Sequence, residues 1–389
     1  MTPSDIDREL AQLDAAFLKR VRRTPANPCG PEMMLDGRML IAFASNDYLG
    51  LANDEALKQG AIAAIEQWGV GAGASQLVSG RLGIFDQLEL RLAEFAQRDA
   101  ALFFPSGFQA NLGVLTALAD RHDVIFADRV NHASLIDGAL LSRAQHVRYQ
   151  HADVAHLKHK LESTPVAAGG TRLIVTDSVF SMDGDEAPLQ ELMQLAEQYD
   201  AWLVVDDAHG LGVLGPQGRG SIADARLPPH SNLIMIGTLG KAAGVSGAFV
   251  AAERNVIEWL IQRARSYIYT TGASPMIAGA LLTSIDRILH GEDLRSRLRE
   301  HIEHLREGIA ALDLPFELLP SRTGIQALVI GDNEPSLKIS ARLLEQGYWV
   351  PAIRPPTVAA GSARLRMSLS AAHTHAQIDG LIQALAKAL

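Results

Sequence analysis

The most suggestive run of residues is an apolar segment that ends in two acids and a histidine, at Trp202–Gly210. An acidic side chain at the end of a buried strand points into the crevice where α/β proteins bind ligands. Asp206 could hold a pyridine nitrogen protonated, which would turn the ring into an electron sink. His209 could donate a hydrogen bond to a phenolate oxygen on that ring. Taken alone, a helix-capping acid beside a partly exposed histidine explains the pattern equally well.

A lysine in a turn of small residues follows another apolar segment, within Met235–Gly244. Lysine is rarely buried unless it has a functional role, and burial lowers the pKa of its amine. A neutral Lys241 amine could form an imine and later act as a base, while Thr238 could donate a hydrogen bond to a phosphate. The turn alone is more typical of a surface loop, but its position after Asp206 in the same predicted sheet favours a site.

Three other polar segments follow predicted strands. Free backbone N–H groups at the start of a helix after Ser106 would form an anion site suited to phosphate, although Ser106 is also an ordinary helix cap. His132 stands between a strand and a helix, where it could stack on a flat ring or simply end the helix. Ser181 could form a hydrogen bond near the same ring, next to the turn residues Met182–Gly184.

The cationic, histidine-rich and glycine-rich segments indicate a function less specifically than the motifs above. Arg366 lies in an alternating segment, Arg364–Ser370, and could clamp a substrate carboxylate, whereas Arg20–Arg23 is more typical of a solvated surface. His151–His159 has metal-like spacing, but no cysteine or carboxylate set completes a site, so we expect no metal. Gly69–Ser75 resembles a dinucleotide loop, yet a predicted helix precedes it, so we interpret it as a loop that closes over a ligand.

The composition excludes several classes of protein. The chain has 389 residues, is 48% hydrophobic and carries a net charge of −9, which argues against a nucleic-acid partner. It contains no polybasic run and no apolar stretch of about 18 residues, so we expect no membrane partner. The first residues are polar and acidic, unlike a signal peptide, and a single cysteine, Cys29, excludes an internal disulfide. We therefore expect a cytoplasmic protein.

Short β-rich segments alternate with helical ones through most of the chain. This alternation predicts βαβ units, and hence an α/β fold with a mostly parallel sheet and helices on both faces. We expect strands at Ala101–Phe104, Val124–Phe126, Leu173–Thr176, Trp202–Val205, Leu233–Ile236 and Ala248–Ala251, and helices at 55–67, 84–98, 107–119, 133–143, 153–162 and 187–199.

The two ends of the chain have a different pattern. Residues 5–20 have helical spacing, with an apolar face that includes Ile6, Leu10, Leu13, Phe17 and Leu18. After residue 285, a charged helix leads into strands near 326–330, 348–353 and 364–369 and helices at 336–346 and 375–388. We expect an N-terminal helix and arm at 1–44, a large ligand-binding domain at 45–285, and a smaller C-terminal α/β domain at 286–389.

Taken together, these motifs resemble the α-oxoamine synthase family of fold-type-I pyridoxal-phosphate enzymes. The resemblance covers nearly the whole chain and keeps the order of the motifs, which are Ser45–Gly50, Ser106–Phe108, Asn131–Ser134, Phe180–Gly184, Asp206–Gly210 and Thr238–Lys241. It implies an aspartate aminotransferase-like transferase fold. Asp177 and Ser178 stand where a Glu-Gly pair is common in the family, and Gln76 lies in a variable part of the glycine loop.

The resemblance also implies a set of site residues. Lys241 would carry pyridoxal 5'-phosphate as a Schiff base, Asp206 would meet the ring nitrogen, and His132 would stack on the ring, so these three would be catalytic. The other cofactor-binding residues would be Gly107, Phe108, Ser181, His209 and Thr238. The substrate-binding positions would be Arg20, His132, Thr357 and Arg366.

The segment Ala352–Val358 is similar to those family members that condense L-alanine with a pimeloyl thioester in the biotin pathway. By this resemblance Arg366 would hold the carboxylate of alanine, and Lys241 would remove its α-proton before decarboxylation. The family implies a homodimer with its active site at the interface. Two alternatives stay open: a sister synthase that uses glycine or serine with another acyl-CoA, and a non-catalytic cofactor-binding subunit, against which the intact Lys241 argues. The acyl carrier could be coenzyme A or a carrier protein.

Overall fold

The computed structural model describes residues 2–389, which form two compact units. The larger unit contains Leu51–Phe180 and Glu186–Asp293. The smaller unit combines residues 2–50 with Ser181–Asp185 and Leu294–Leu389. The division into domains at 1–44, 45–285 and 286–389 stays a prediction.

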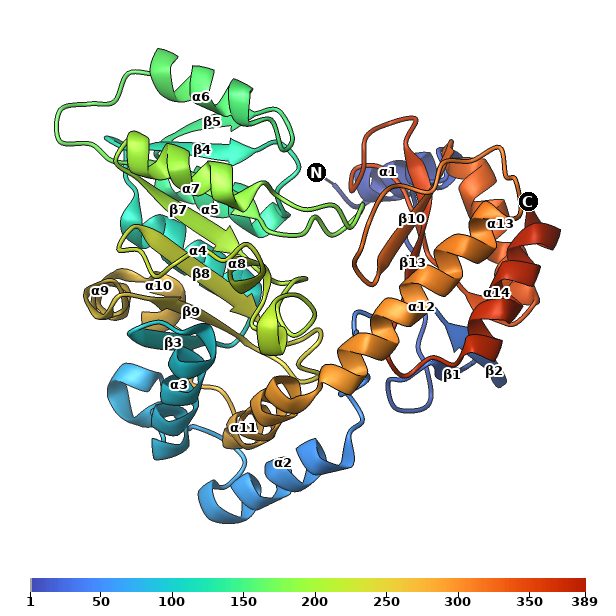
Figure 1. Cartoon of the computed structure of the whole chain (residues 1–389), viewed down its shortest axis with the longest axis horizontal. Helices are drawn as coiled ribbons and strands as arrows, with labels where there is room; N and C mark the ends of the chain where they lie inside the picture. The colour runs from blue at the N-terminus through green and yellow to red at the C-terminus, as the bar shows by residue number, and fades with distance from the viewer. Residues whose placement is uncertain (1) are drawn as a thin grey trace. The chain divides into compact units, whose positions relative to one another are not determined.

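A seven-stranded sheet forms the centre of the larger unit (Figure 1). Six strands are parallel to one another, and β9 is antiparallel to both of its neighbours. The strand order is β3 (Ala100–Phe104), β9 (Ala248–Ala252), β8 (Leu233–Thr238), β7 (Ala201–Asp206), β6 (Arg172–Asp177), β4 (Val124–Asp128) and β5 (Gln145–Tyr149). The prediction of a mostly parallel sheet is confirmed, while β5 was not predicted.

Helices cover both faces of this sheet, as expected, with α7 on one face and α4 and α5 on the other (Figure 1). Alternate strand residues share one apolar core with α4, α5, α9 and α10. The bounds of these elements are α4 (Gly107–Leu118), α5 (Ala133–Ser142), α7 (Leu189–Gln198), α9 (Arg254–Arg263) and α10 (Arg265–Ile268). The unit also contains α2 (Glu55–Trp68), α3 (Gly83–Ala96), α6 (Val154–Ser163), α8 (Ser221–Asp224), α11 (Pro275–His290), a π-helix at Gln76–Gly80 and a 3₁₀ turn at Pro216–Gly218.

The smaller unit has two three-stranded sheets. One has the order β10 (Ile325–Gly331), β13 (Ala363–Ser368) and β12 (Ala352–Ile353), and the other has β1 (Glu32–Leu35), β2 (Arg38–Ala42) and β11 (Tyr348–Trp349). The single strand predicted at 348–353 is wrong, because Val350 and Pro351 interrupt it and its two halves pair in different sheets. The helices are α1 (Pro3–Ala15), α12 (Glu292–Ala310), α13 (Asn333–Glu345) and α14 (His375–Ala388).

The N-terminal helix is shorter than the predicted range 5–20, since α1 ends at Ala15. Phe17 has a φ of 57°, in the left-handed region that stops an α-helix. The expected apolar face is not buried within this chain, because Ile6 is 47% exposed and Leu10 is 44% exposed. Neither α1 nor any other helix in residues 2–389 combines the length and apolar character needed to cross a membrane.

Candidate active site

Asp206 ends β7 with a side chain that is only 4% exposed. Its Oδ2 accepts a hydrogen bond from Asn111 Nδ2 at 2.6 Å, and its Oδ1 accepts one from the Ala208 N–H at 3.0 Å. Two donors therefore fix the plane of the carboxyl group. No role was predicted for Asn111 from the sequence, although an amide within the otherwise apolar segment of α4 was a signal that could have found it.

His132 caps α5 and is held by both its main chain and its ring. Its backbone N–H donates to Asp177 Oδ2 at 2.6 Å, and its Nδ1 lies 2.7 Å from Ser134 Oγ. Burial lowers the pKa of the His132 imidazole. The Asp206 charge raises this pKa, whereas the Lys241 charge lowers it further. A neutral imidazole at neutral pH is a flat surface that can stack on another ring.

Lys241 lies in the turn that follows β8, three residues after Thr238. Burial is the largest cause of the shifted pKa values of His132 and Asp177, and the Lys241 charge lowers the pKa of both groups. Gly107 begins α4 and packs against Thr238, where an added Cβ would lie 2.8 Å from Oγ1. The start of a helix therefore meets a hydroxyl group, an arrangement that suits a phosphate.

Asp207, the second acid of the motif, has an environment of its own. Its fully buried carboxyl group accepts hydrogen bonds from Ser178 Oγ at 2.6 Å, from Ser221 Oγ at 2.6 Å and from the Ser221 N–H at 2.8 Å. Burial raises the pKa of Asp207 to about 6, although these hydrogen bonds oppose the rise. The bonds anchor the loop that carries His209, and they give Ser178 a structural role as a donor.

Arg366 lies on β13 and is 5% exposed. Its Nε donates to the Ser181 carbonyl at 2.6 Å, its Nη1 to Ser368 Oγ at 2.8 Å and its Nη2 to Asn46 Oδ1 at 3.1 Å. Within residues 2–389 these three acceptors are all neutral, so the buried guanidinium charge is positioned without a carboxylate partner. Such a cation is suited to a carboxylate ligand.

Arg20 and Thr357 are far apart in the sequence but lie close together in the smaller unit. Arg20 Nη2 lies 3.5 Å from Thr357 Oγ1, and both side chains are exposed. Arg354, from the same segment as Thr357, donates to the Phe17 carbonyl oxygen. Burial lowers the pKa of the Arg354 guanidinium, and the nearby charge of Arg20 adds to the effect. This end of the smaller unit therefore presents two neighbouring cations.

The predicted site residues divide between the two units. The larger unit brings together the strand-end residues and helix starts, and the smaller unit brings Ser181 to Arg366 and Arg20 to Thr357. The larger unit carries Gly107, Phe108, His132, Asp206, His209, Thr238 and Lys241, and the smaller unit carries Arg20, Ser181, Thr357 and Arg366. The contacts that each of them makes with a cofactor or a substrate stay predictions.

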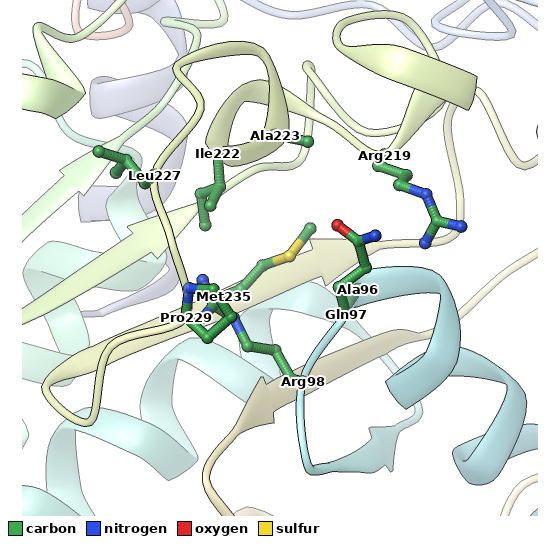
Figure 2. Close-up of a pocket in the computed structure, with 9 residues that line it drawn as sticks. All are labelled: Ala96, Gln97, Arg98, Arg219, Ile222, Ala223, Leu227, Pro229 and Met235. Carbon is green, nitrogen blue, oxygen red and sulfur yellow. The ribbon is translucent and has the colours of Figure 1, made fainter.

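A small pocket in the larger unit is separate from these residues (Figure 2). Figure 2 shows it between Arg98, Arg219 and Met235, and its cavity volume is about 40 Å³. A cavity of this size has room for a few water molecules but not for a cofactor. None of the predicted site residues lines it.

The chain belongs to the class I and II aminotransferase family, whose model matches residues 38–385. It is 52% identical to the 8-amino-7-oxononanoate synthase of Herminiimonas arsenicoxydans over 99% of both chains. It is similar to a solved structure of SPT with its PLP internal aldimine, with a TM-score of 0.92 and 29% identity, covering 99% of this chain and 96% of that one. It is also similar to the solved 8-amino-7-oxononanoate synthase of Francisella tularensis, with a TM-score of 0.77 and 34% identity, covering 90% of this chain and 97% of that one.

These similarities confirm three of the expectations drawn from the sequence. The chain is an α-oxoamine synthase, it has the fold of the fold-type-I transferases, and its cofactor is pyridoxal 5'-phosphate. The geometry of the larger unit fits that cofactor. A buried carboxyl group, a lysine in a turn, a flat neutral imidazole, and a helix start where a Cβ on Gly107 would clash are all present.

Proposed function

We propose that this chain condenses L-alanine with a pimeloyl thioester, with loss of carbon dioxide, to form 8-amino-7-oxononanoate. The observation that carries the proposal is the similarity along the full length to synthases named for this product, at 52% identity for the relative from Herminiimonas arsenicoxydans. The geometry supports it, because Arg366 offers a buried cation with neutral partners to a substrate carboxylate.

Pyridoxal phosphate supplies a ring that withdraws electrons from the α-carbon of a bound amino acid. The Lys241 amine would hold the cofactor covalently, and the same side chain would take the α-proton of the bound amino acid as general base. The Asp206 carboxylate, fixed by Asn111 and Ala208, would hold the proton on the ring nitrogen. The neutral His132 imidazole would cover one face of the ring.

The remaining predicted residues bind and orient the ligands. Arg366 holds the carboxylate of alanine through charge-assisted hydrogen bonds. Arg20, beside Thr357, takes the free carboxylate at the far end of the pimeloyl chain. The helix start at Gly107 and Phe108, together with the Thr238 hydroxyl, would bind the phosphate, and we propose His209 and Ser181 as further cofactor-binding residues.

A substrate matrix tests the proposal. Purified holoenzyme is assayed with L-alanine, glycine and L-serine, each paired with pimeloyl-, acetyl- and palmitoyl-CoA, by following thiol release and product mass. We expect the highest kcat/KM for alanine with pimeloyl-CoA. A preference for glycine with acetyl-CoA, or for serine with palmitoyl-CoA, would assign the chain to a sister synthase. A parallel arm with pimeloyl-loaded carrier protein identifies the carrier.

Reductive labelling tests the role of Lys241. Borohydride reduction of the yellow holoenzyme, followed by peptide mapping, should place the cofactor on Lys241, and Lys241→Ala should abolish turnover. A label on any other lysine would contradict the assignment.

We also propose that the chain acts in the cytoplasm as a homodimer. Sedimentation of the holoenzyme should give twice the mass of the chain, and a monomer that remains fully active would contradict the proposed assembly.

A further inference from the structure

A chain of hydrogen bonds links two carboxyl groups of the larger unit. Asp177 and Asp206 are paired in register at the ends of the neighbouring parallel strands β6 and β7. Asp177 accepts the His132 N–H at 2.6 Å, and His132 Nδ1 lies 2.7 Å from Ser134 Oγ. Asn111 Nδ2 then donates to Ser134 Oγ at 2.8 Å and to Asp206 Oδ2 at 2.6 Å. The strand pairing closes this chain into a circuit.

The direction of the bonds fixes the state of the His132 ring. The Ser134 backbone N–H donates to His132 Nδ1 at 3.3 Å, so Nδ1 is an acceptor and the ring proton is on Nε2. Ser134 Oγ accepts from Asn111 and can therefore donate its own proton to the same Nδ1. The ring is held from one side by Ser134, and its main chain is held from the other side by Asp177.

The loop before His132 is joined to β6 at a second point. Asn131 Nδ2 donates to the Val175 carbonyl at 2.8 Å, and Asn131 Oδ1 accepts the Asp177 N–H at 3.1 Å. Asn131 and Asp177 therefore bind this loop to the strand next to the one that carries Asp206. The position of His132 relative to Asp206 depends on these bonds.

We propose that Asp177 is a positioning residue for the reaction proposed above. Its hydrogen bond to the His132 N–H fixes the main chain of His132 and thereby holds the imidazole where it can cover the ring that Asp206 would bind. The inference rests on the proposed function. No contact between Asp177 and the substrate is required, because Asp177 acts through the His132 N–H.

The charge state of Asp177 is compatible with this role. Burial raises the pKa of Asp177 well above its usual range, and the Asp206 carboxylate adds to the rise, as does Asp128. The hydrogen bond from the His132 N–H and the Lys241 charge oppose it. A neutral carboxyl group still accepts the N–H through its carbonyl oxygen, and it does not compete with Asp206 for the cationic ring nitrogen. An amide at this position should therefore work almost as well.

Two substitutions at Asp177 separate the hydrogen bond from the charge. Asp177→Asn keeps an oxygen acceptor for the His132 N–H, so we expect its cofactor dissociation constant and kcat to stay within about threefold of the wild type. Asp177→Ala leaves a buried N–H without a partner, a loss that corresponds to about a tenfold change or more. We expect Asp177→Ala to weaken cofactor binding and lower kcat by about tenfold, and to leave KM for the pimeloyl thioester within about twofold.

Two measurements distinguish positioning from a general loss of structure. The visible circular dichroism of the bound cofactor reports its orientation, and we expect a changed band in Asp177→Ala but not in Asp177→Asn. In a double-mutant cycle with His132→Ala, which removes the ring, Asp177→Ala should have little further effect on kcat. Fully additive losses would overturn the proposal, as would an Asp177→Asn variant as impaired as Asp177→Ala.

The wild-type protein separates a failure of this inference from a failure of the proposed function. If the wild type binds the cofactor and forms the expected product while both Asp177 variants match it, only the role of Asp177 is wrong. If the wild type binds the cofactor but prefers another substrate pair, the proposed function is wrong and the spectroscopic comparison of the variants still decides the role of Asp177.

Discussion

Replacing Asp206 with asparagine removes a charge from the site with little change of shape. Two donors point at the native carboxyl group, Asn111 Nδ2 at 2.6 Å from Oδ2 and the Ala208 N–H at 3.0 Å from Oδ1. An amide has only one oxygen, so Asp206→Asn leaves one buried donor facing an NH₂ group. An unsatisfied buried donor costs about 1–3 kcal/mol. We expect the apo-protein to lose free energy of unfolding in this range, measured by urea denaturation.

The catalytic loss should be larger than the loss of stability suggests. The amide of Asp206→Asn cannot hold the ring nitrogen protonated. A carboxylate charge at this position lowers the activation barrier by several kcal/mol. Since about 1.4 kcal/mol corresponds to a factor of ten, kcat should fall by about a hundredfold or more. The cofactor should remain bound, because Lys241 and the phosphate contacts are unchanged. Absorbance measures cofactor content, and product mass measures turnover with alanine and pimeloyl-CoA.

The matched control is Asn111→Ala, which breaks the same hydrogen bond from the other side and keeps the carboxylate. We expect its kcat to fall by less than about tenfold, because the charge at the ring nitrogen remains. If kcat of Asp206→Asn also falls by less than tenfold, the reasoning is refuted and Asp206 is not the partner of the ring nitrogen.

Three other predictions concern the substrate cations and the loop after β7. Arg366→Ala should raise KM for alanine, and Arg20→Ala should raise KM for the pimeloyl thioester. Each increase should correspond to about 1.5–3 kcal/mol of binding free energy, measured from initial rates. If each variant instead raises KM for the other substrate, the two roles are exchanged. Gly220→Ala should reduce the free energy of unfolding by about 3 kcal/mol or more, because φ is +94° and the new Cβ would lie 1.9 Å from Asp207 Oδ2; Gly71→Ala, with open space, serves as the control. Burial raises the pKa of Asp207 from 3.8 to about 6, so the folded protein keeps a proton that the unfolded chain releases. The stability of the wild-type apo-protein relative to Asp207→Asn should therefore fall by about 2 kcal/mol as the pH rises from about 4 to about 6. The same pH dependence of the free energy of unfolding in both proteins, measured by urea denaturation at each pH, would contradict this.

The interior strands of the larger sheet could be predicted from the sequence because each is a short apolar segment bounded by polar residues. The segment Leu233–Ile236, for example, lies within β8. The edge strand β5 could not be found in this way, since Gln145–Tyr149 includes His146 and Arg148 and only Tyr149 is fully buried. The split between β11 and β12 depends on pairing with strands far away in the sequence, which the local pattern does not reveal.

The strand-end positions of Asp206, His132 and Lys241 could also be predicted, because parallel strands end at the same edge of a sheet. The roles of Asn111 and Asp177 could not. Both roles depend on which helix packs beside which strand. Hydrogen bonds between residues 111 and 206, or between residues 132 and 177, cannot be inferred from the local spacing of residues.

The pairing of β2 with β11 has a consequence for the order in which the molecule can be assembled. During synthesis the ribosome releases Arg38–Ala42 early, whereas Tyr348 and Trp349, which pair with Ile41 and Ala42, come near the end of the 389-residue chain. At about 5–20 residues per second, β2 waits for tens of seconds with this edge unpaired. During that interval the whole larger unit emerges. The nascent β1–β2 hairpin therefore exposes an unpaired strand edge throughout that interval, and the smaller unit is completed only after the larger unit has been made.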